Sequence, residues 1–360
     1  MADRVFVIAE AGVNHNGSPE MAFRLIDAAA EAGADAVKFQ TFRTEKVVTA
    51  AAPKAAYQAA NTGEGGSQID MIRKLELGDE VFRRLAEHAA ARNIEFMSTP
   101  FDLDSLRFLA GGDMGLRRLK VPSGEITNAL LLLEAARTGL PLIVSTGMST
   151  LDEIEAALGV IAFGFARANE IPSLAKCRAA LASAAGRAAL KEKVTLLHCT
   201  TEYPAPVEDV NLRAMATMRE RFGLPVGYSD HTQGIAVPIA AVAMGAVALE
   251  KHFTLDRTLP GPDHRASLEP GELKAMVGGI RAASASLGSA EKAPTPSEMP
   301  NIPIARRSLV AARAIRRGEV FDAAMIDAKR PGGGLSPMLA WSLIGTAAKR
   351  DFAKDEKLEA

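Results

Sequence analysis

The chain has 360 residues, a length that suits either two mid-sized domains or one large α/β barrel with an appendage. Its 42 Lys and Arg residues balance 43 Asp and Glu residues, which leaves a formal net charge of −1. This balance provides no broad positive field, so it argues against nucleic acid or an anionic membrane as a partner. Any anion that this protein binds must therefore be held by a local cluster of residues.

The cysteine content and the N-terminal sequence both indicate an intracellular protein. The two cysteines, Cys177 and Cys199, are too few for a disulfide framework, so we expect a reducing, cytoplasmic location. The N-terminal MADRVFVIAEAG lacks the charged and long apolar regions of a signal peptide. No apolar run approaches the roughly 18 to 20 residues that span a bilayer, so we expect no membrane anchoring.

Short runs rich in Val, Ile and Phe alternate with Ala-, Glu- and Arg-rich segments of helical period. The predicted strands cover residues 5–10, 36–41, 94–99, 117–122, 142–146, 194–199, 225–229 and 246–252. The predicted helices lie near residues 19–32, 79–92, 103–111, 128–138, 150–165, 209–221, 233–244 and 269–287. Eight strand–helix units favour a closed (β/α)₈ TIM barrel. An open doubly wound sheet is the alternative, because pattern alone does not reveal closure.

Three segments interrupt this alternation. Residues 43–78 form a long connection, and we expect a lid there because loops of that length are usually functional or disordered. Residues 166–191 are rich in Ala and Arg and have the helical propensity of a structural insertion. The run KAPTPSEMPNIP at 292–303 has four prolines, which predicts an interdomain linker with no regular element. The predicted divisions are a barrel domain, a linker and a compact strand-rich module, at residues 1–290, 291–303 and 304–360.

Polar residues fall at the ends of all eight predicted strands, where the reactive groups of a (β/α)₈ barrel lie. They are Glu10, Lys38, Gln40, Ser98, Thr99, Lys120, Ser123, Glu125, Ser145, Thr146, His198, Thr200, Thr201, Tyr203, Ser229, Asp230, His231, Glu250, Lys251 and His252. Burying so many polar groups without a ligand or mutual pairing would be costly. They therefore predict one cavity that binds a large polar or anionic ligand.

Two of these residues, Lys38 and Lys120, predict a cradle for phosphate and carboxylate groups, since such anions need several convergent donors. The hydroxyl groups that accompany them belong to Thr99, Ser123, Ser145 and Ser229. Two alternatives remain open. Either lysine could pair with Glu10 or Glu125 for structural reasons alone. Either could instead form a Schiff base, as in an aldolase, because burial depresses the pKa of a lysine.

The histidines His231 and His252 end successive predicted strands, so their rings can approach one another as metal ligands do. Imidazole binds Mn, Fe, Co or Zn, whereas oxygen ligands from Glu, water and substrate favour Mn or Mg. His15 is a weaker third candidate. His198 and Cys199 are adjacent on a strand and point to opposite faces, so we interpret Cys199 as a packed core residue and not as an activated nucleophile.

The motifs of this sequence resemble those of the sialic acid synthase family over nearly the whole chain. They are AEAGVNHNG, GADAVKFQTF, STPFD, KVPSGEITN, VSTGM, HCTTEYPAP, GYSDHTQG, EKHFTLDRTLPGPDH and KRPGGG. The resemblance implies a TIM barrel followed by a small antifreeze-like (SAF) domain. It also implies condensation of phosphoenolpyruvate with the open-chain aldehyde of an N-acylated mannosamine-type sugar, with C–O cleavage and release of phosphate.

The resemblance implies roles for individual residues as well. Phosphoenolpyruvate would be held by Lys38, Lys120, Thr99, Ser123, Ser145 and Ser229. His231 and His252 would bind a divalent metal, Mn or Mg, that polarises the aldehyde. Glu125 is the candidate acceptor of a proton from the attacking water. The acceptor sugar would be oriented by Glu10, Gln40, Tyr203 and Asp263.

One further role depends on the resemblance almost alone. In the family, the arginine of the KRPGGG motif, here Arg330, reaches from the antifreeze-like domain of one subunit into the barrel of its partner. The resemblance therefore implies a domain-swapped homodimer. The proline-containing linker permits that reach.

The identity of the acceptor sugar depends on finer differences. Thr201 stands where sialic acid synthases often have Asn, and its motif HCTTEYPAP, with the SQIDMIRKLEL segment ending at Leu77, is similar to synthases of N,N′-diacetyllegionaminate. That product would come from a 2,4-diacetamido-trideoxy sugar, whereas N-acetylneuraminate from N-acetylmannosamine is the alternative. A Schiff-base barrel aldolase and a non-catalytic carbohydrate-binding protein are more distant alternatives.

Overall fold

The structure, a computed structural model, describes residues 4–62, 67–167 and 169–359. It contains two compact units, Met1–Gly288 and Ser289–Ala360. Each unit has its own cluster of buried hydrophobic side chains. Within the described ranges, no helix combines the length and the apolar character needed to cross a bilayer.

The first unit is built around eight parallel strands. They are β1 (Phe6–Gly12), β2 (Ala36–Thr41), β3 (Glu95–Pro100), β4 (Leu119–Val121), β5 (Leu142–Ser145), β6 (Val194–Cys199), β7 (Val226–Asp230) and β8 (Ala248–His252). Their order in the sheet is β3-β2-β1-β8-β7-β6-β5-β4. The end strands β3 and β4 lie against one another, and Arg118 Nε pairs with Glu95 Oε1 across this seam at 2.8 Å. The predicted (β/α)₈ barrel is therefore confirmed.

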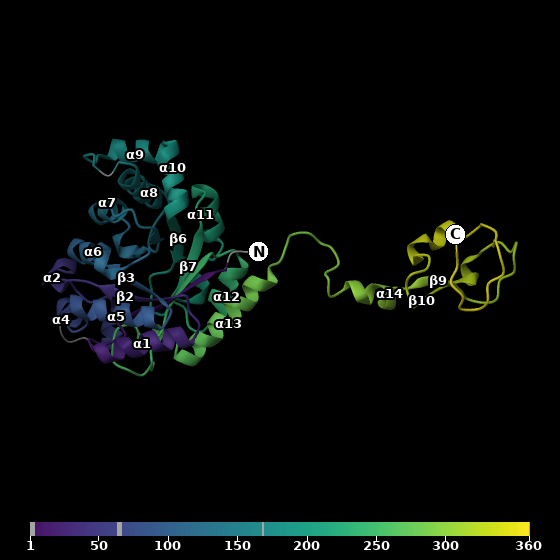
Figure 1. Ribbon diagram of the computed structural model, residues 1–360, viewed down its shortest axis with the longest axis horizontal. Helices are drawn as coiled ribbons and strands as arrows, with labels where there is room; N and C mark the ends of the chain where they lie inside the picture. The colour runs from purple at the N-terminus through teal and green to yellow at the C-terminus, as the bar shows by residue number, and fades with distance from the viewer. Residues whose placement is uncertain (1–3, 63–66, 168, 360) are drawn as a thin grey trace. The chain divides into compact units, whose positions relative to one another are not determined.

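Helices that follow the strands cover the outside of the barrel (Figure 1). They are α1 (Pro19–Glu31), α5 (Asp79–Ala91), α6 (Leu103–Ala110), α7 (Ala129–Arg137), α8 (Leu151–Ala166), α11 (Ala214–Phe222), α12 (Ala236–Ala243) and α13 (Pro270–Ser286). Each overlaps a predicted helix. The helix predicted from residue 209 begins later, at Ala214, because residues 207–209 form a 3₁₀ turn and Asn211 takes a positive φ of 48°.

The two segments that interrupt the alternation within the barrel both contain helices. The predicted lid, residues 43–78, contains α2 (Thr44–Val47), α3 (Ala56–Thr62) and α4 (Gln68–Arg73), while residues 63–66 lie outside the described residues. Ser67 begins α4 with a capping box, since its hydroxyl accepts from Asp70 N and the Asp70 carboxylate accepts from Ser67 N. The insertion after α8 forms α9 (Leu174–Ala182) and α10 (Ala184–Lys193), which pack on α8 (Figure 1).

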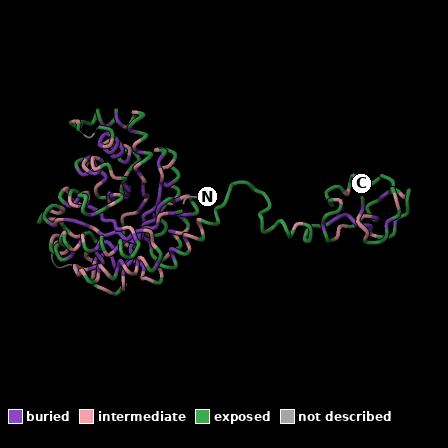
Figure 2. Tube along the Cα trace, viewed as in Figure 1, coloured by how far each residue is buried: buried purple, intermediate pink, exposed green. Residues whose placement is uncertain are grey.

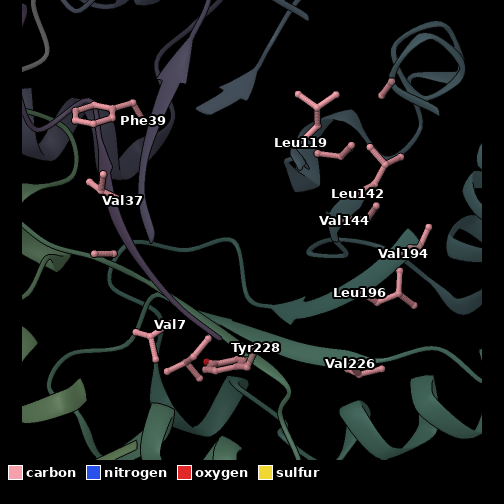
Figure 3. Close-up of a cluster of buried hydrophobic side chains, with 14 of the residues drawn as sticks. Val7, Val37, Phe39, Leu119, Leu142, Val144, Val194, Leu196, Val226 and Tyr228 are labelled. Atoms are coloured by element: carbon pink, nitrogen blue, oxygen red, sulfur yellow. The ribbon is translucent and has the colours of Figure 1, made fainter. Parts of the chain in front are cut away.

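The side chains of the strands point alternately outward and inward, and the two sets differ in chemistry. The outward set forms the main core, part of which Figure 3 shows: Val7, Val37, Phe39, Leu119, Leu142, Val144, Val194, Leu196, Val226 and Tyr228. The inward set forms a small apolar layer inside the barrel: Ile8, Ala36, Met97, Ile143, Leu197 and Ala248. Two residues further along the strands, the inward positions become polar. The apolar layer is therefore the floor on which the polar groups rest.

The second unit is small and has little helix. Its strands β9 (Ser308–Ala311) and β10 (Ile326–Lys329) pair antiparallel, and its buried core includes Leu309, Phe321 and Phe352. Residues 289–301 are exposed (Figure 2). The prediction that the proline-rich run has no regular element is wrong at its end, where η5 (Met299–Asn301) and α14 (Ile302–Ala305) each accept a proline in their first turn. The unit also contains the short α15 (Ala340–Leu343) and the 3₁₀ turns η6 (Ala323–Met325) and η7 (Pro337–Leu339).

A buried ion pair joins β7 and β8 on the outer face of the barrel. Lys251 Nζ lies 2.5 Å from Asp230 Oδ2 and donates to Thr232 O at 2.5 Å, and both side chains of the pair are fully buried. The Tyr228 hydroxyl donates to the other Asp230 oxygen at 3.0 Å. The outward Asp230 precedes the inward His231, and the outward Lys251 precedes His252. The pair therefore fixes the two strand ends on which these histidines lie.

Replacing Lys251 by Met should lower the free energy of unfolding of the barrel by about 3 to 5 kcal/mol, because it leaves the Asp230 carboxylate buried without its cation. Urea unfolding followed by far-ultraviolet circular dichroism would measure the change. The conservative Lys251→Arg, which keeps the cation beside Asp230, is the control and should lose less stability. A loss below about 1 kcal/mol would show that the pair does not hold these strand ends.

Candidate active site

A cavity of about 310 Å³ opens at the C-terminal ends of the barrel strands. Its volume lies in the range of small-molecule sites. Thirteen of the fifteen predicted site residues line it: Glu10, Lys38, Gln40, Thr99, Lys120, Ser123, Ser145, Thr201, Tyr203, Ser229, His231, His252 and Asp263. The structure therefore brings together side chains from all eight strands or the loops that follow them.

A cluster of two lysines and two glutamates lies at the bottom of this cavity, directly above the apolar floor. Lys38 Nζ lies 2.6 Å from Glu10 Oε2 and 3.6 Å from Glu250 Oε2. Lys120 Nζ lies 3.6 Å from Glu250 Oε1, so Glu250 stands between the two lysines. We call Glu10, Lys38, Lys120 and Glu250 the floor cluster. All four side chains are buried, and their formal charges cancel.

Hydroxyl groups surround the floor cluster. Lys38 donates to Thr99 Oγ1 at 3.0 Å, and Lys120 donates to Ser145 Oγ at 2.7 Å. The Ser229 hydroxyl donates to Glu250 Oε1 at 3.1 Å, and the Ser123 hydroxyl accepts from Gly147 N at 3.0 Å. Ammonium and hydroxyl donors in this arrangement can hold a phosphate or a carboxylate from several sides.

Burial and mutual pairing shift the pKa values of the floor cluster in opposite directions. Burial raises the pKa of Glu10 to about 7, although Lys38 opposes the shift. Burial acts on Glu250 in the same sense, but Lys120 and Lys38 outweigh it and hold the pKa of Glu250 below its ordinary value. Burial lowers the pKa of Lys120, whereas Glu10 and Glu250 overcome burial and raise the pKa of Lys38. Glu10 is therefore the carboxyl group of this cluster suited to exchange a proton near neutral pH.

Two neutral histidines lie beside the floor cluster. The ring centroids of His231 and His252 are 5.7 Å apart. His231 Nδ1 donates to Thr200 O at 2.6 Å, which leaves Nε2 as its acceptor nitrogen. His252 Nδ1 is buried without a hydrogen-bonding partner. Burial lowers the pKa of His231 to about 4 and that of His252 well below 6.5, so both rings are neutral at pH 7, as metal ligands must be.

These two rings fit a divalent metal, because no hydrogen bond within the described part of the chain occupies His231 Nε2 or His252 Nδ1. No group of three or more His, Cys, Asp and Glu side chains among the described residues has the arrangement of a metal site. Oxygen atoms of water or substrate would therefore have to complete the coordination.

Further polar side chains lie higher in the cavity. The Thr201 hydroxyl is buried without a hydrogen-bonding partner among the described residues, and burial raises the pKa of the Asp263 carboxyl to about 6. The Gln40 amide donates to Glu10 Oε1 at 3.2 Å. The Tyr203 ring lies with its centroid 4.2 Å from that of His231. The hydroxyl groups of a ligand would satisfy the polar atoms that the protein leaves unpaired.

Two predicted site residues are not part of the cavity lining. Glu125 ends the 3₁₀ turn η2 (Ser123–Glu125), and its carboxylate accepts from Asn128 Nδ2 at 2.6 Å. Arg330 belongs to the second unit, where its side chain is exposed and its Nε donates to Ala305 O at 2.9 Å.

Several of the other predictions need correction. Five more residues predicted at the strand ends do not line the cavity: Ser98, Thr146, Thr200, Asp230 and Lys251. His198 faces outward and its Nε2 donates to Val210 O at 2.6 Å, so it does not reach the cavity. Cys199 is buried, as predicted for a packed residue, but it faces inward and lines the cavity, 3.1 Å from the Ser123 hydroxyl. His15 does not line the cavity, and its Nδ1 accepts from Gly17 N at 3.1 Å.

The sequence reasoning also gave no role to Glu250, which the structure places between the two lysines. The sequence did contain a signal for this position. Glu250 lies two residues before His252, and residues two apart in a strand point to the same face of the sheet. The residues that the lid contributes to the cavity were missed as well: Val47, Val48, Gln58, Gln68, Met71, Ile72 and Leu75. Helices of four to seven residues in a long loop give no comparable periodic signal.

Comparison with known proteins agrees with this geometry. The NeuB family matches residues 25–292, and the SAF domain matches residues 306–359. The N,N′-diacetyllegionaminic acid synthase of Campylobacter jejuni is 44% identical over 353 residues, which cover 98% of each chain. The enzyme of the same name from Legionella pneumophila is 45% identical over 341 residues, 95% of this chain and 89% of the relative.

More distant relatives and a solved structure extend the comparison. The human N-acetylneuraminate-9-phosphate synthase is 33% identical over 98% of this chain and 91% of its own. The crystal structure of the N-acetylneuraminic acid (sialic acid) synthetase of Leptospira borgpetersenii superposes with a TM-score of 0.67 at 35% identity, covering 84% of this chain and 91% of that one. The barrel, the polar cavity and these matches agree, and the chain belongs to the NeuB family of sialic-type, or nonulosonic, acid synthases.

Proposed function

We propose that this enzyme condenses phosphoenolpyruvate with the open-chain aldehyde of an N-acylated mannosamine-type sugar and releases phosphate. The observation that carries the proposal is the convergence of Lys38, Lys120 and two neutral histidines in one cavity. The favoured product is N,N′-diacetyllegionaminate, because the two relatives at 44 and 45% identity carry that name. N-acetylneuraminate is the alternative product.

In this proposal the floor cluster and its hydroxyls bind phosphoenolpyruvate. The ammonium groups of Lys38 and Lys120 face its negative charges, and hydroxyl groups complete the contacts: Thr99, Ser123, Ser145 and Ser229. The methylene carbon of phosphoenolpyruvate attacks the aldehyde carbon of the sugar, which forms the new C–C bond. Water then attacks C2, the C–O bond to phosphate breaks, and phosphate leaves with the bridging oxygen, so that a 2-keto acid remains.

The chain's own carboxyl groups would move the protons of this reaction. Glu10, with a pKa of about 7, lies in the floor cluster and would orient the aldehyde together with Gln40, which donates to it. We propose that Glu125 accepts a proton from the attacking water, because its neighbours Ser123 and Gly124 line the cavity; its carboxylate must turn away from Asn128 to reach that water. Tyr203, Thr201 and Asp263 would contact the rest of the sugar: all three line the cavity.

A divalent ion would be held by His231 and His252, the two rings with a free nitrogen. When bound, Mn or Mg supplies a Lewis acid that polarises the aldehyde oxygen. We favour Mn, because imidazole ligands bind it better than they bind Mg.

Two further proposals concern the whole molecule. We propose a cytoplasmic enzyme, supported by two buried cysteines that are not joined in a disulfide. We also propose a barrel domain at 1–290, a linker at 291–303 and an antifreeze-like domain at 304–360, assembled as a domain-swapped homodimer. The SAF match at 306–359 supports the division into domains. The exposed Arg330 side chain supports the swapped dimer, because it is free to reach a partner subunit.

Replacing Lys120 by Met should raise the KM for phosphoenolpyruvate and lower kcat/KM by about 10- to 100-fold, the loss expected for a charged hydrogen bond. Steady-state assays of phosphate release would measure both constants. Lys46, on the lid but outside the cavity lining, offers the matched control, because Lys46→Met removes the same charge at an exposed site. Equal effects of the two substitutions would refute the phosphoenolpyruvate site.

Replacing His252 by Phe should abolish activity and weaken Mn²⁺ binding by about 10-fold or more, since one of two protein ligands is lost. The electron paramagnetic resonance signal of free Mn²⁺ reports binding without reference to activity. The wild-type enzyme treated with a chelator should lose activity and regain it with Mn²⁺. Unchanged Mn²⁺ affinity in the variant would place the metal elsewhere.

Mixing an Arg330→Ala chain with a His252→Phe chain tests the swapped dimer. If Arg330 acts on the partner's barrel, each mixed dimer has one intact site, so an equal mixture recovers roughly a quarter of wild-type activity. The chains must be refolded together to exchange partners, and each variant refolded alone is the control. Activity no higher than that of the two variants alone would show that Arg330 does not act in trans.

A further inference from the structure

The described residues of the lid, 43–62 and 67–78, form one wall of the cavity, and this wall is mostly apolar. Its contribution consists of Val47, Val48, Gln58, Gln68, Met71, Ile72 and Leu75. Behind it, Val13, Phe42 and Leu75 form a small buried cluster against which Val47, Ile72 and Phe101 pack. The wall is therefore a packed surface with its own core, which makes it able to select a ligand by shape and polarity.

The lid lies on the mouth side of the floor cluster. Strand β2 carries Lys38 in the floor cluster, then Gln40 one inward position higher, and the chain enters the lid directly afterwards. In the proposed reaction the aldehyde carbon, C1, must meet phosphoenolpyruvate over the floor cluster. The far end of the sugar, C4 to C6, then extends toward the mouth, where it meets the lid.

Two carboxamides interrupt the apolar wall. Gln68 Nε2 donates to Gln58 Oε1 at 3.4 Å, a long contact, and the same oxygen accepts from Ala55 N at 3.0 Å. Within the described part of the chain, the Gln68 carbonyl oxygen and the Gln58 amide have no other partner. Gln68 is also fixed in place, because it is the first residue of α4 and follows the capping box of Ser67 and Asp70. A donor and an acceptor are thus available in an otherwise apolar surface.

This surface fits an acetamido group and a methyl group better than it fits hydroxyls. The C4 hydroxyl and the C6 hydroxymethyl of N-acetylmannosamine would need several partners, and side chains such as Met71 and Ile72 provide none. In a 2,4-diacetamido-2,4,6-trideoxy sugar, the C6 methyl can pack on those side chains. Its C4 acetamido group can exchange hydrogen bonds with a carboxamide, N–H to C=O in each direction.

We propose that the lid selects the acceptor sugar: Gln68, with Gln58, binds the 4-acetamido group, and Met71 and Ile72 contact the C6 methyl. The inference rests on the proposed function, since it places C1 of the sugar over the floor cluster. It adds the residues that distinguish a diacetamido-trideoxy acceptor from N-acetylmannosamine, and it assigns this discrimination to α4.

The test compares kcat/KM for the two sugars, at saturating phosphoenolpyruvate, in the wild-type enzyme and in Gln68→Met. This substitution keeps the length of the side chain and removes its hydrogen bonds. The kcat/KM for the 2,4-diacetamido sugar should fall on the order of 10-fold or more, while that for N-acetylmannosamine changes less than about threefold. Lys74→Met, at the end of the same helix with an exposed side chain outside the cavity lining, should leave both values unchanged.

A second variant, Ile72→Asn, tests the apolar part of the wall by adding a polar group to it, whereas Gln68→Met removes one. It should raise the ratio of kcat/KM for N-acetylmannosamine over the diacetamido sugar by about 3- to 10-fold. The KM for phosphoenolpyruvate should stay unchanged in every variant, which shows that the barrel is folded and its floor cluster intact.

The outcomes separate the two proposals. Wild-type enzyme that releases no phosphate with either sugar overturns the proposed function, and the inference with it. Two other results overturn the inference alone. One is a wild-type enzyme that prefers N-acetylmannosamine. The other is a ratio of kcat/KM between the two sugars that stays at the wild-type value in Gln68→Met and in Ile72→Asn.

Discussion

The site depends on one electrostatic constraint: two buried lysines must be neutralised inside a barrel. Lys38 and Lys120 are both about 3% exposed, and Glu250 stands 3.6 Å from each of them. Burying either cation alone would cost several kcal/mol, so the carboxylates of Glu10 and Glu250 are required for the fold as well as for the site. The same pairing leaves the cluster neutral, so a bound anion meets two ammonium groups that are already in place.

The apolar layer inside the barrel and the ion pair on its outer face hold the floor cluster in position. The inward apolar residues below the lysines exclude water, and the ion pair of Asp230 and Lys251 fixes the ends of β7 and β8 from the outer side. Because side chains alternate along the strands, the floor cluster inside the barrel is separated from the buried ion pair of Asp230 and Lys251 outside it. Glu250 and His252 face the cavity, while Lys251 between them faces the helices.

Much of this arrangement could be predicted from the sequence, because strand alternation and strand-end chemistry are local patterns. All eight strands were placed correctly, and most of the predicted site residues line one cavity. The errors arose where the direction of a side chain decides its role. His198 and Cys199 do point to opposite faces, but His198 is the one outside the cavity; Glu250 was predicted in the cavity, although not its place between the two lysines.

Features that depend on tertiary contacts could not be predicted in this way. The Glu125 carboxylate bonds to Asn128 because a 3₁₀ turn follows β4, and no sequence period encodes that turn. The apolar wall of the lid comes from short helices whose packing on Val13, Phe42 and Phe101 is not local in sequence. The family resemblance supplied the chemistry of the site, whereas only the structure brings the lid to it.

The reaction itself offers the most direct test of the account. Phosphoenolpyruvate labelled with ¹⁸O at the bridging oxygen should be incubated with Mn²⁺ and the 2,4-diacetamido-trideoxy sugar, and the released phosphate analysed by mass spectrometry. The account predicts one phosphate per nine-carbon acid formed, with the label in the phosphate. Label retained in the sugar acid, or no phosphate release with any N-acylated mannosamine-type sugar, would contradict it.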